Sequence, residues 1–254
     1  MGKVYLVGAG PGAPDLITLR AARLLEAADI VFYDALVHPD TLALAKRARK
    51  VNVGKRYGKI STEQRFIHRA LIEAAHAHEI VVRLKGGDPM IFARAQEEID
   101  ALTQAGIGWE VVPGVTAASA AAAVLGVSLT RRGIARTVAL LTPRVGRDET
   151  ASDWLPAALG ADSVVLYMAA GASQDIAATL IEAGKPAATP VALVESATLP
   201  GERRLFTTLG ELRALALARA AGPVVMCVGE VFRDRSGLER IDLPSIVRRA
   251  SAPQ

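Results

Sequence analysis

The sequence predicts an α/β protein of two domains. Continuous apolar runs such as Val4–Val7 and Ile30–Tyr33 alternate with segments of helical spacing, a pattern typical of a parallel or mixed sheet covered on both faces. The 254 residues are long for one compact domain and sufficient for two. A composition of 51% hydrophobic and 22% charged residues excludes a disordered protein, because there is ample apolar surface to bury.

The first half of the chain is predicted to alternate strands and helices. Strands are expected at Val4–Val7, Ile30–Tyr33, Val51–Val53, Ile80–Leu84 and Trp109–Val112. Helices are expected at Thr18–Ala28, at Thr41–Ala48, from Ser61 to about His78, and from Pro89 to about Ala105. The third of these helices opens on Ser61-Thr62-Glu63-Gln64, an S-x-x-Q capping box.

The second half is also mixed, but its rhythm changes. Strands are expected at Val138–Leu141, Val164–Met168, Val191–Glu195, Leu205–Thr207 and Val224–Gly229, and helices at Trp154–Leu159, Gln174–Ala183 and Glu211–Ala220. Because only a loop separates the third and fourth of these strands, we expect them to pair antiparallel. We therefore expect an N-terminal domain over residues 1–113, a C-terminal domain over 114–244, and a frayed tail over 245–254.

Composition also limits the class of protein. The segment between Glu110 and Arg131 is uncharged and long enough to cross a bilayer, but Pro113-Gly114 and its many small residues favour a buried strand, a turn and a core helix. No signal peptide precedes the first strand, so no membrane attachment is expected. The single cysteine, Cys227, excludes a disulfide framework and indicates a reducing, cytoplasmic compartment. The four histidines show no metal spacing, so no metal is expected.

The first strand is followed by Gly8-Ala9-Gly10-Pro11-Gly12-Ala13, which matches the dinucleotide-binding pattern G-x-G-x-x-G/A. Asp34, at the end of the second strand, stands where a ribose-binding acid would lie. Against a nicotinamide site, Pro11 and Pro14 remove backbone donors, and the residues up to Thr18 delay the helix. A nicotinamide site and a purely structural tight turn both remain open from this motif alone.

Two further loops follow predicted strands, at residues 85–89 (KGGDP) and 112–117 (VPGVTA). Each alone fits an ordinary turn, with Asp88 as a cap, but three small-residue loops at strand ends favour one shared small-molecule cleft. The net charge of +4 is too small for a protein that coats nucleic acid and suits a small acidic ligand. Basic side chains in separate loops, among them Arg94 and Arg132, fit a substrate with several carboxylates, unless they are solvated surface groups.

The motifs, taken in order, resemble the uroporphyrinogen-III C-methyltransferases of the tetrapyrrole methylase family. They are VYLVGAGPGAPDLITLRAARLLEAADIVFYDALV, VGKRYG, VVRLKGGDPMIFARAQEE, VVPGVTAASAAAA, SLTRR, VVLYMA and VGEVF. The resemblance covers residues 3 to about 233. A fused siroheme synthase is not expected, because no chain precedes the methylase motif.

The resemblance implies a two-domain tetrapyrrole methylase-like fold, with S-adenosylmethionine (SAM) bound in a cleft between the domains and no metal. It implies a cytoplasmic homodimer that methylates uroporphyrinogen III twice, through precorrin-1 to precorrin-2, in cobalamin or siroheme biosynthesis, releasing S-adenosylhomocysteine. The alternatives are a methyltransferase of a later precorrin and a SAM- or tetrapyrrole-binding protein with impaired catalysis.

The resemblance also assigns roles to individual positions. Asp34 and Lys55 match the proton acceptor and donor, and a base is chemically required because the methylated ring must lose a proton from a neighbouring carbon. Cofactor-binding positions are Pro11, Gly86, Gly87, Asp88, Ile91, Thr116, Ala117, Met168 and Ala197. Substrate-contacting positions are Arg94, Glu97, Arg132 and Met168, with Arg94 also catalytic. The chain departs from the family pattern by alanine in place of glycine at positions 93, 95, 169 and 197, where each added methyl is expected to narrow the cleft.

Overall fold

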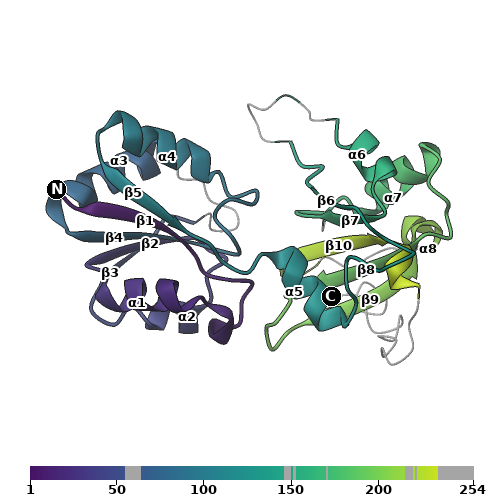
Figure 1. Ribbon diagram of the computed structural model, residues 1–254, viewed down its shortest axis with the longest axis horizontal. Coiled ribbons are helices and arrows are strands. Elements are labelled where there is room, and N and C mark those ends of the chain that lie inside the picture. The colour runs from purple at the N-terminus through teal and green to yellow at the C-terminus, as the bar shows by residue number, and fades with distance from the viewer. Residues whose placement is uncertain are drawn as a thin grey trace, which may run out of the picture. The chain divides into compact units, whose positions relative to one another are not determined.

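The computed structural model describes residues 1–54, 64–145, 150, 153–169, 171–214, 220 and 222–233. The chain divides into two compact units, Met1–Ala117 and Ala118–Gln254, here called the first and second domains (Figure 1). The division coincides with the start of helix α5 (Ala117–Leu125), four residues after the boundary expected at residue 113. The backbone N–H of Gly114 donates to the carboxylate of Asp88, which attaches this segment to the first domain.

The first domain is built on a five-stranded parallel sheet. Its strands are β1 (Lys3–Gly8), β2 (Ile30–Tyr33), β3 (Arg49–Asn52), β4 (Ile80–Lys85) and β5 (Gly108–Val112), in the order β3-β2-β4-β1-β5. All four neighbouring pairs are parallel, with Gly8 opposite Lys85 at the carboxyl ends of β1 and β4. The predicted strands are therefore confirmed within two residues at each end.

Helices cover both faces of this sheet (Figure 1). On one face α1 (Leu19–Ala27) and α2 (Pro39–Ala43) enclose a core that includes Leu25 and Leu84, and on the other α3 (Gln64–Ala77) and α4 (Ala95–Gln104) enclose one that includes Leu71 and Leu102. The neighbouring strands β1 and β4 thus connect to helices on opposite faces. In open α/β sheets, the carboxyl ends of two such strands form the crevice where ligands bind.

Two helix starts show what local sequence does and does not determine. The delay of the first helix is confirmed, because α1 begins only at Leu19. A 3₁₀ turn over Pro14–Leu16 precedes it, and Thr18 caps it by accepting a hydrogen bond from Ala21 N–H (3.2 Å). The prediction that the fourth helix starts at Pro89 is wrong, because α4 begins at Ala95. Asp88 instead accepts from the N–H of Met90 and holds the following residues in a turn. The capping-box residues 61–63 lie outside the described part of the chain.

The second domain contains a mixed five-stranded sheet, β6-β7-β10-β8-β9. Its strands are β6 (Val138–Leu141), β7 (Ser163–Leu166), β8 (Pro190–Glu195), β9 (Arg203–Thr208) and β10 (Val224–Gly229). The predicted antiparallel pairing of β8 and β9 is confirmed, with Leu193 opposite Leu205. The other helices are α6 (Leu155–Gly160), α7 (Ser173–Glu182), α8 (Leu209–Ala214) and a 3₁₀ turn (Glu230–Phe232). Among the described helices of both domains, none is long and apolar enough to cross a membrane.

The core of the first domain gives a direct test of this packing. Leu71 on α3 is fully buried, so Leu71→Ala should lower the free energy of unfolding of this domain by about 2–5 kcal/mol. Leu19→Ala, on α1, removes a side chain that is 76% exposed, and this change should stay within about 0.5 kcal/mol. Denaturant unfolding followed by Trp109 fluorescence in a Trp154→Phe background measures both. Equal losses in the two variants would contradict the assigned core.

Candidate functional site

The loops after β1 and β4 are joined through their backbones. Gly10 N–H donates to Gly87 O (3.2 Å) and Gly87 N–H donates to Gly10 O (2.7 Å), forming an isolated antiparallel bridge. Ala9 N–H donates to Lys85 O (2.8 Å) immediately before it. The two loops therefore hold each other at the carboxyl ends of neighbouring strands.

The third loop, after β5, packs against Gly87 and against Gly8 at the end of β1. A Cβ placed on Gly114 would lie 2.3 Å from Gly87 O, and one placed on Gly8 would lie 2.6 Å from Gly114 Cα. Neither distance is possible between non-bonded atoms, so only glycine allows this contact. Asp88 completes it by accepting from Gly114 N–H (3.0 Å) and Met90 N–H (2.7 Å). The three loops that the sequence analysis singled out lie together in the structure.

The glycine pair after β4 combines close packing with an open side. A Cβ on Gly86 would lie 2.9 Å from Leu36 Cβ, whereas one on Gly87 would meet no atom within 4 Å. Gly87 also has φ +67°, a left-handed conformation that favours glycine. A ligand can therefore approach the backbone at Gly87. Ile91 lies in the turn that follows, where its N–H donates to Asp88 O (3.3 Å).

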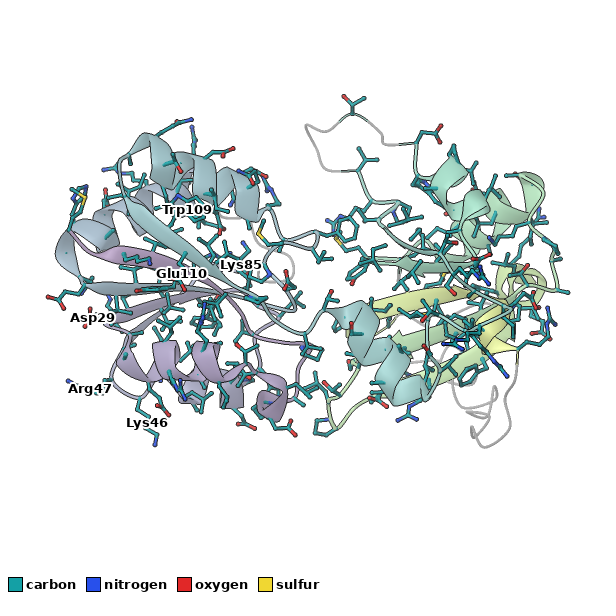
Figure 2. The ribbon with its side chains drawn as sticks, viewed as in Figure 1. Asp29, Lys46, Arg47, Lys85, Trp109 and Glu110 are labelled. Atoms are coloured by element: carbon teal, nitrogen blue, oxygen red, sulfur yellow. The ribbon has the colours of Figure 1, made fainter. Side chains whose placement is uncertain are left out.

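Asp34 follows β2 and is ion-paired with Arg83 on β4, at 2.6 Å between Oδ1 and Nη2. Arg83 in turn binds Glu98 on α4, at 3.1 Å between Nε and Oε1, and Lys85 Nζ lies 2.9 Å from the same oxygen. The side chains of Arg83 and Lys85 are 3% exposed and that of Glu98 is fully buried, while that of Asp34 is 28% exposed (Lys85 is labelled in Figure 2). We call these four residues the buried charge cluster.

The buried charge cluster shifts the pKa of both its cations. Burial opposes the charge on Arg83, but the Glu98 and Asp34 carboxylates outweigh burial and raise the Arg83 pKa. Burial and the neighbouring Arg83 lower the pKa of Lys85. Sequence reasoning missed the ion pairs of Arg83 with Asp34 and Glu98. The available signal was the alternation of two cations with apolar residues within a buried strand (RLK at 83–85), since unpaired charges are rarely buried.

Two of the predicted substrate-contacting residues bind each other. The guanidinium of Arg94 makes two bonds of 2.6 Å to the carboxylate of Glu97 at the start of α4. The hydrogen bond from Arg94 is the main cause that lowers the pKa of Glu97. Both side chains are about half exposed, at 55% and 45%, so the pair is accessible from solvent.

Strained backbone marks predicted site positions in each domain. Among the described residues, the non-glycine residues with positive φ are Phe92, Arg94, Met168, Ser196 and Thr198. Arg94 and Met168 are predicted site residues, Phe92 follows Ile91, and the last two flank Ala197. Such conformations cost of order 1–3 kcal/mol each and cluster at functional sites. Alanines 93, 95, 169 and 197 are outside this group. An alanine in place of glycine therefore puts no methyl group on a residue with positive φ at these positions.

In the second domain, the predicted residues lie at different edges of the sheet. Met168 follows β7 and is 44% exposed, and Ala197 follows β8, which runs in the same direction as β7. Arg132 is exposed in a turn closed by the Arg131–Ala135 bridge, before the start of β6. Since β6 and β7 are parallel, Arg132 lies at the end of the sheet where these two strands begin, and Met168 lies at the end where they finish. Lys55 lies outside the described residues.

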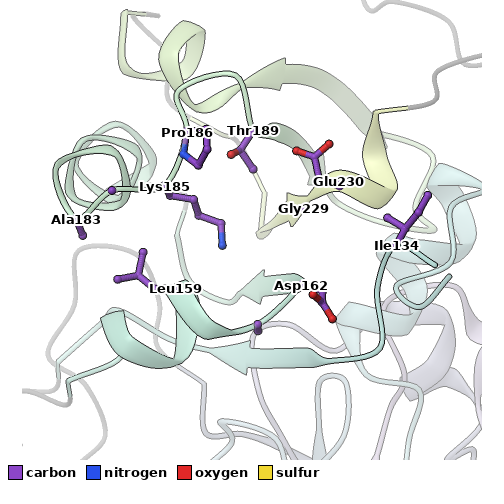
Figure 3. A pocket seen from close by; sticks show the side chains of 11 residues that line it. Ile134, Leu159, Asp162, Ala183, Lys185, Pro186, Thr189, Gly229 and Glu230 are labelled. Atoms are coloured by element: carbon purple, nitrogen blue, oxygen red, sulfur yellow. The ribbon is translucent and has the colours of Figure 1, made fainter. Parts of the chain in front are cut away.

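A separate cavity of about 480 Å³ lies in the second domain, lined by Ile134, Leu159, Asp162, Lys185, Thr189 and Glu230 among others (Figure 3). Lys185 Nζ donates to Ala158 O (2.8 Å), and burial lowers the pKa of Lys185. None of the predicted site residues lines this cavity. In the described part of the chain, no three His, Cys, Asp or Glu side chains are grouped to hold a metal ion.

The parallel sheet with glycine-joined loops at its carboxyl edge, followed by a mixed-sheet domain, defines an α/β protein with a small-molecule site at strand ends. Comparison with known sequences identifies the family. The chain belongs to the tetrapyrrole (corrin/porphyrin) methylases, whose family model matches residues 3–213. The predicted family and fold class are thereby confirmed.

The chain is similar to proteins of named activity. It is 44% identical to the uroporphyrinogen-III C-methyltransferase of Pseudomonas aeruginosa, over 92% of this chain and 95% of that protein. It is also 44% identical to the siroheme synthase of Azotobacter vinelandii, over 94% of this chain but 52% of that protein, so it spans about half of that relative. A crystal structure of uroporphyrin-III C-methyl transferase from Thermus thermophilus complexed with S-adenyl homocysteine matches with a TM-score of 0.80 and 42% identity, over 91% of this chain and 99% of that one.

The glycine contacts between the loops make a stability prediction. Gly114→Ala forces a Cβ against Gly87 O, so it should lower the free energy of unfolding of the first domain by about 1–3 kcal/mol. Gly108→Ala is the matched control, because its Cβ would meet only Lys3 Cγ at 4.0 Å. Denaturant unfolding compares the two variants. A Gly114→Ala protein as stable as the Gly108→Ala protein would contradict the described packing.

Proposed function

We propose that the chain transfers methyl groups from SAM to uroporphyrinogen III, twice, giving precorrin-2 through precorrin-1. The observation that carries the proposal is the group of three glycine-joined loops at the carboxyl edge of the first sheet, with one glycine backbone left open. The 44% identity to a relative named for this activity, along nearly the whole of both chains, supports the substrate. The coproduct is S-adenosylhomocysteine.

The residues of the three loops fit SAM. Gly86, Gly87 and Asp88 form the central loop. Pro11 follows Gly10, which is bonded to Gly87, and Ile91 N–H donates to Asp88 O. Thr116 and Ala117 end the third loop at the start of α5. We propose that these residues bind SAM, and that Met168 and Ala197 contribute from the second domain. SAM carries an activated methyl group on a sulfonium, so the protein mainly has to position the two reactants and exclude water.

Arg94 is proposed to bind a carboxylate of the substrate and to act in catalysis. Its planar fork already holds a carboxylate, that of Glu97, in a two-point contact. A substrate carboxylate therefore competes with Glu97 for Arg94, and both residues contact the substrate once it is bound. Arg132, which is exposed in the turn before β6, is proposed as a second contact with a substrate carboxylate.

Asp34 is proposed as the proton acceptor and Lys55 as the proton donor. An electron-rich pyrrole carbon attacks the methyl group, and the ring then loses a proton from a neighbouring carbon. The Asp34 carboxylate is partly exposed at the end of β2 and ion-paired through Oδ1, so it is held as an acceptor near the open loop edge.

We further propose that the protein is a cytoplasmic homodimer that serves cobalamin or siroheme biosynthesis and binds neither nucleic acid nor membrane. The family resemblance supports the dimer and the pathway. The net charge of +4 supports a small acidic substrate over nucleic acid.

SAM binding is tested at Gly87. Gly87→Leu should abolish SAM binding measured by calorimetry, because its side chain would fill the space that the ligand needs. Gly106→Leu is the matched control, since Gly106 has φ +68° and equally open surroundings at the end of α4, and it should bind SAM as the wild type does. Saturable binding of NAD together with no binding of SAM by the wild type would overturn the cofactor proposal.

The reaction is tested by product mass. Incubation with SAM and uroporphyrinogen III should give a product heavier by two methyl-for-hydrogen replacements. SAM binding without any change in the mass of the tetrapyrrole would identify a binding protein with impaired catalysis. Methylation of a later precorrin, with uroporphyrinogen III left unchanged, would identify a different methyltransferase.

Substrate recognition is tested at Arg94. Arg94→Leu should raise KM for uroporphyrinogen III by about 10- to 100-fold, the value of a lost charge-assisted hydrogen bond, with unchanged affinity for SAM. Arg94→Lys should recover part of this loss because it keeps the charge but not the fork. Arg69→Leu removes a comparable exposed arginine paired with Glu73 on α3 and should leave KM unchanged. Wild-type KM in the Arg94→Leu protein would rule out this contact.

A further inference from the structure

The guanidinium of Arg83 is held at three points inside the first domain. Its Nε donates to Glu98 Oε1 (3.1 Å), its Nη1 to Leu84 O (3.1 Å) and its Nη2 to Asp34 Oδ1 (2.6 Å). The side chain is 3% exposed. Three donors on a planar group, each fixed to a different acceptor, leave the orientation of the group no freedom.

Glu98 holds Arg83 from the interior side and is itself bound by Lys85. Glu98 Oε1 accepts from Arg83, from Lys85 Nζ (2.9 Å) and from Gln64 Nε2 (3.2 Å). The buried charge cluster contains two cations and two carboxylates, so its formal charges balance. Apolar residues of similar size would often stabilise a core as well as or better than such a cluster, so its stability contribution alone does not explain why it is buried here.

The only member of the cluster that reaches solvent is Asp34, with 28% of its side chain exposed. Arg83 engages Oδ1, and within the described part of the chain no hydrogen bond reaches the other carboxylate oxygen, Oδ2. The cluster therefore fixes Oδ1 of Asp34 from the interior, while Oδ2 takes no part in the ion pair with Arg83. A carboxylate held in this way is ready to accept a proton in one orientation.

We infer that Arg83 is a positioning residue for Asp34, with Glu98 holding Arg83 in place. This inference rests on the proposed role of Asp34 as proton acceptor. Arg83 itself is too buried to contact the substrate, so its effect on the reaction passes through the orientation of the Asp34 carboxylate. The structure assigns it an effect on turnover and not on the binding of either substrate.

A double-mutant cycle tests the inference. Arg83→Met should lower kcat by about 10²-fold, because a misplacement of about 1 Å costs that much, while KM for uroporphyrinogen III and Kd for SAM change less than about threefold. Arg83→Lys should restore part of kcat, since it keeps the charge but loses the planar group that fixes the three donors in direction. In an Asp34→Asn background, Arg83→Met should cause no further loss of kcat.

The cycle separates the two proposals. Wild-type kcat in Asp34→Asn alone would overturn Asp34 as the base, and with it this inference. A reduced kcat in Asp34→Asn, combined with the same loss from Arg83→Met in both backgrounds, would overturn the inference and leave the base intact. If Arg83→Met does not fold, as judged by thermal melting, Arg83→Lys is carried through the same cycle, and equal losses in both backgrounds again refute the positioning role.

Discussion

Direct contact between the backbones of Gly8, Gly87 and Gly114 is the constraint on which the site depends. Any side chain at positions 8 or 114 would overlap a neighbouring backbone atom, so the three strand ends can approach only as glycines. The Gly10–Gly87 bridge and the Asp88 carboxylate then fix the loops relative to one another. Because β1 and β4 connect to helices on opposite faces, the fixed loops lie where a parallel sheet is open to a ligand. The proposed methyl-donor site is thus a consequence of strand order and of a few positions without side chains.

Features that cost stability lie at or behind predicted site positions in each domain. The first domain buries Arg83, Lys85 and Glu98 directly behind Asp34, although burial of charge is expensive even when it is paired. Left-handed backbone at Arg94 and at Met168 adds strain beside predicted site positions in each domain. Alanines 93, 95, 169 and 197 do not themselves have positive φ, although Ala93 and Ala197 each lie between two residues that do. These features lower the stability of the fold at positions where the proposed site needs a fixed geometry.

The sequence predicts the strands well because most of them contain a continuous apolar run, and β2, β6 and β10 coincide with their predicted bounds. It also predicts that the three loops meet, because parallel strands end at one edge of a sheet. It does not predict the start of α4, which depends on the bonds of Asp88 to Met90 and to Gly114, twenty-six residues away. The pairing of Arg83 with Glu98 escapes for a related reason, since it requires knowing which face of β4 meets α4. A contact between residues far apart in the chain contributes to each of these two features, and local propensity alone does not reveal it.

Hydrogen exchange of individual backbone amides, followed by NMR on the whole chain without ligand, tests the central claim most directly. The claim is that the loops are fixed before any ligand binds. The amides of Gly87 and Gly114, bonded to Gly10 O and to the Asp88 carboxylate, should then exchange as slowly as those within β1 and β4. Exchange of these two amides at the rate of open loops elsewhere in the chain would contradict it, because the site would then form only on binding.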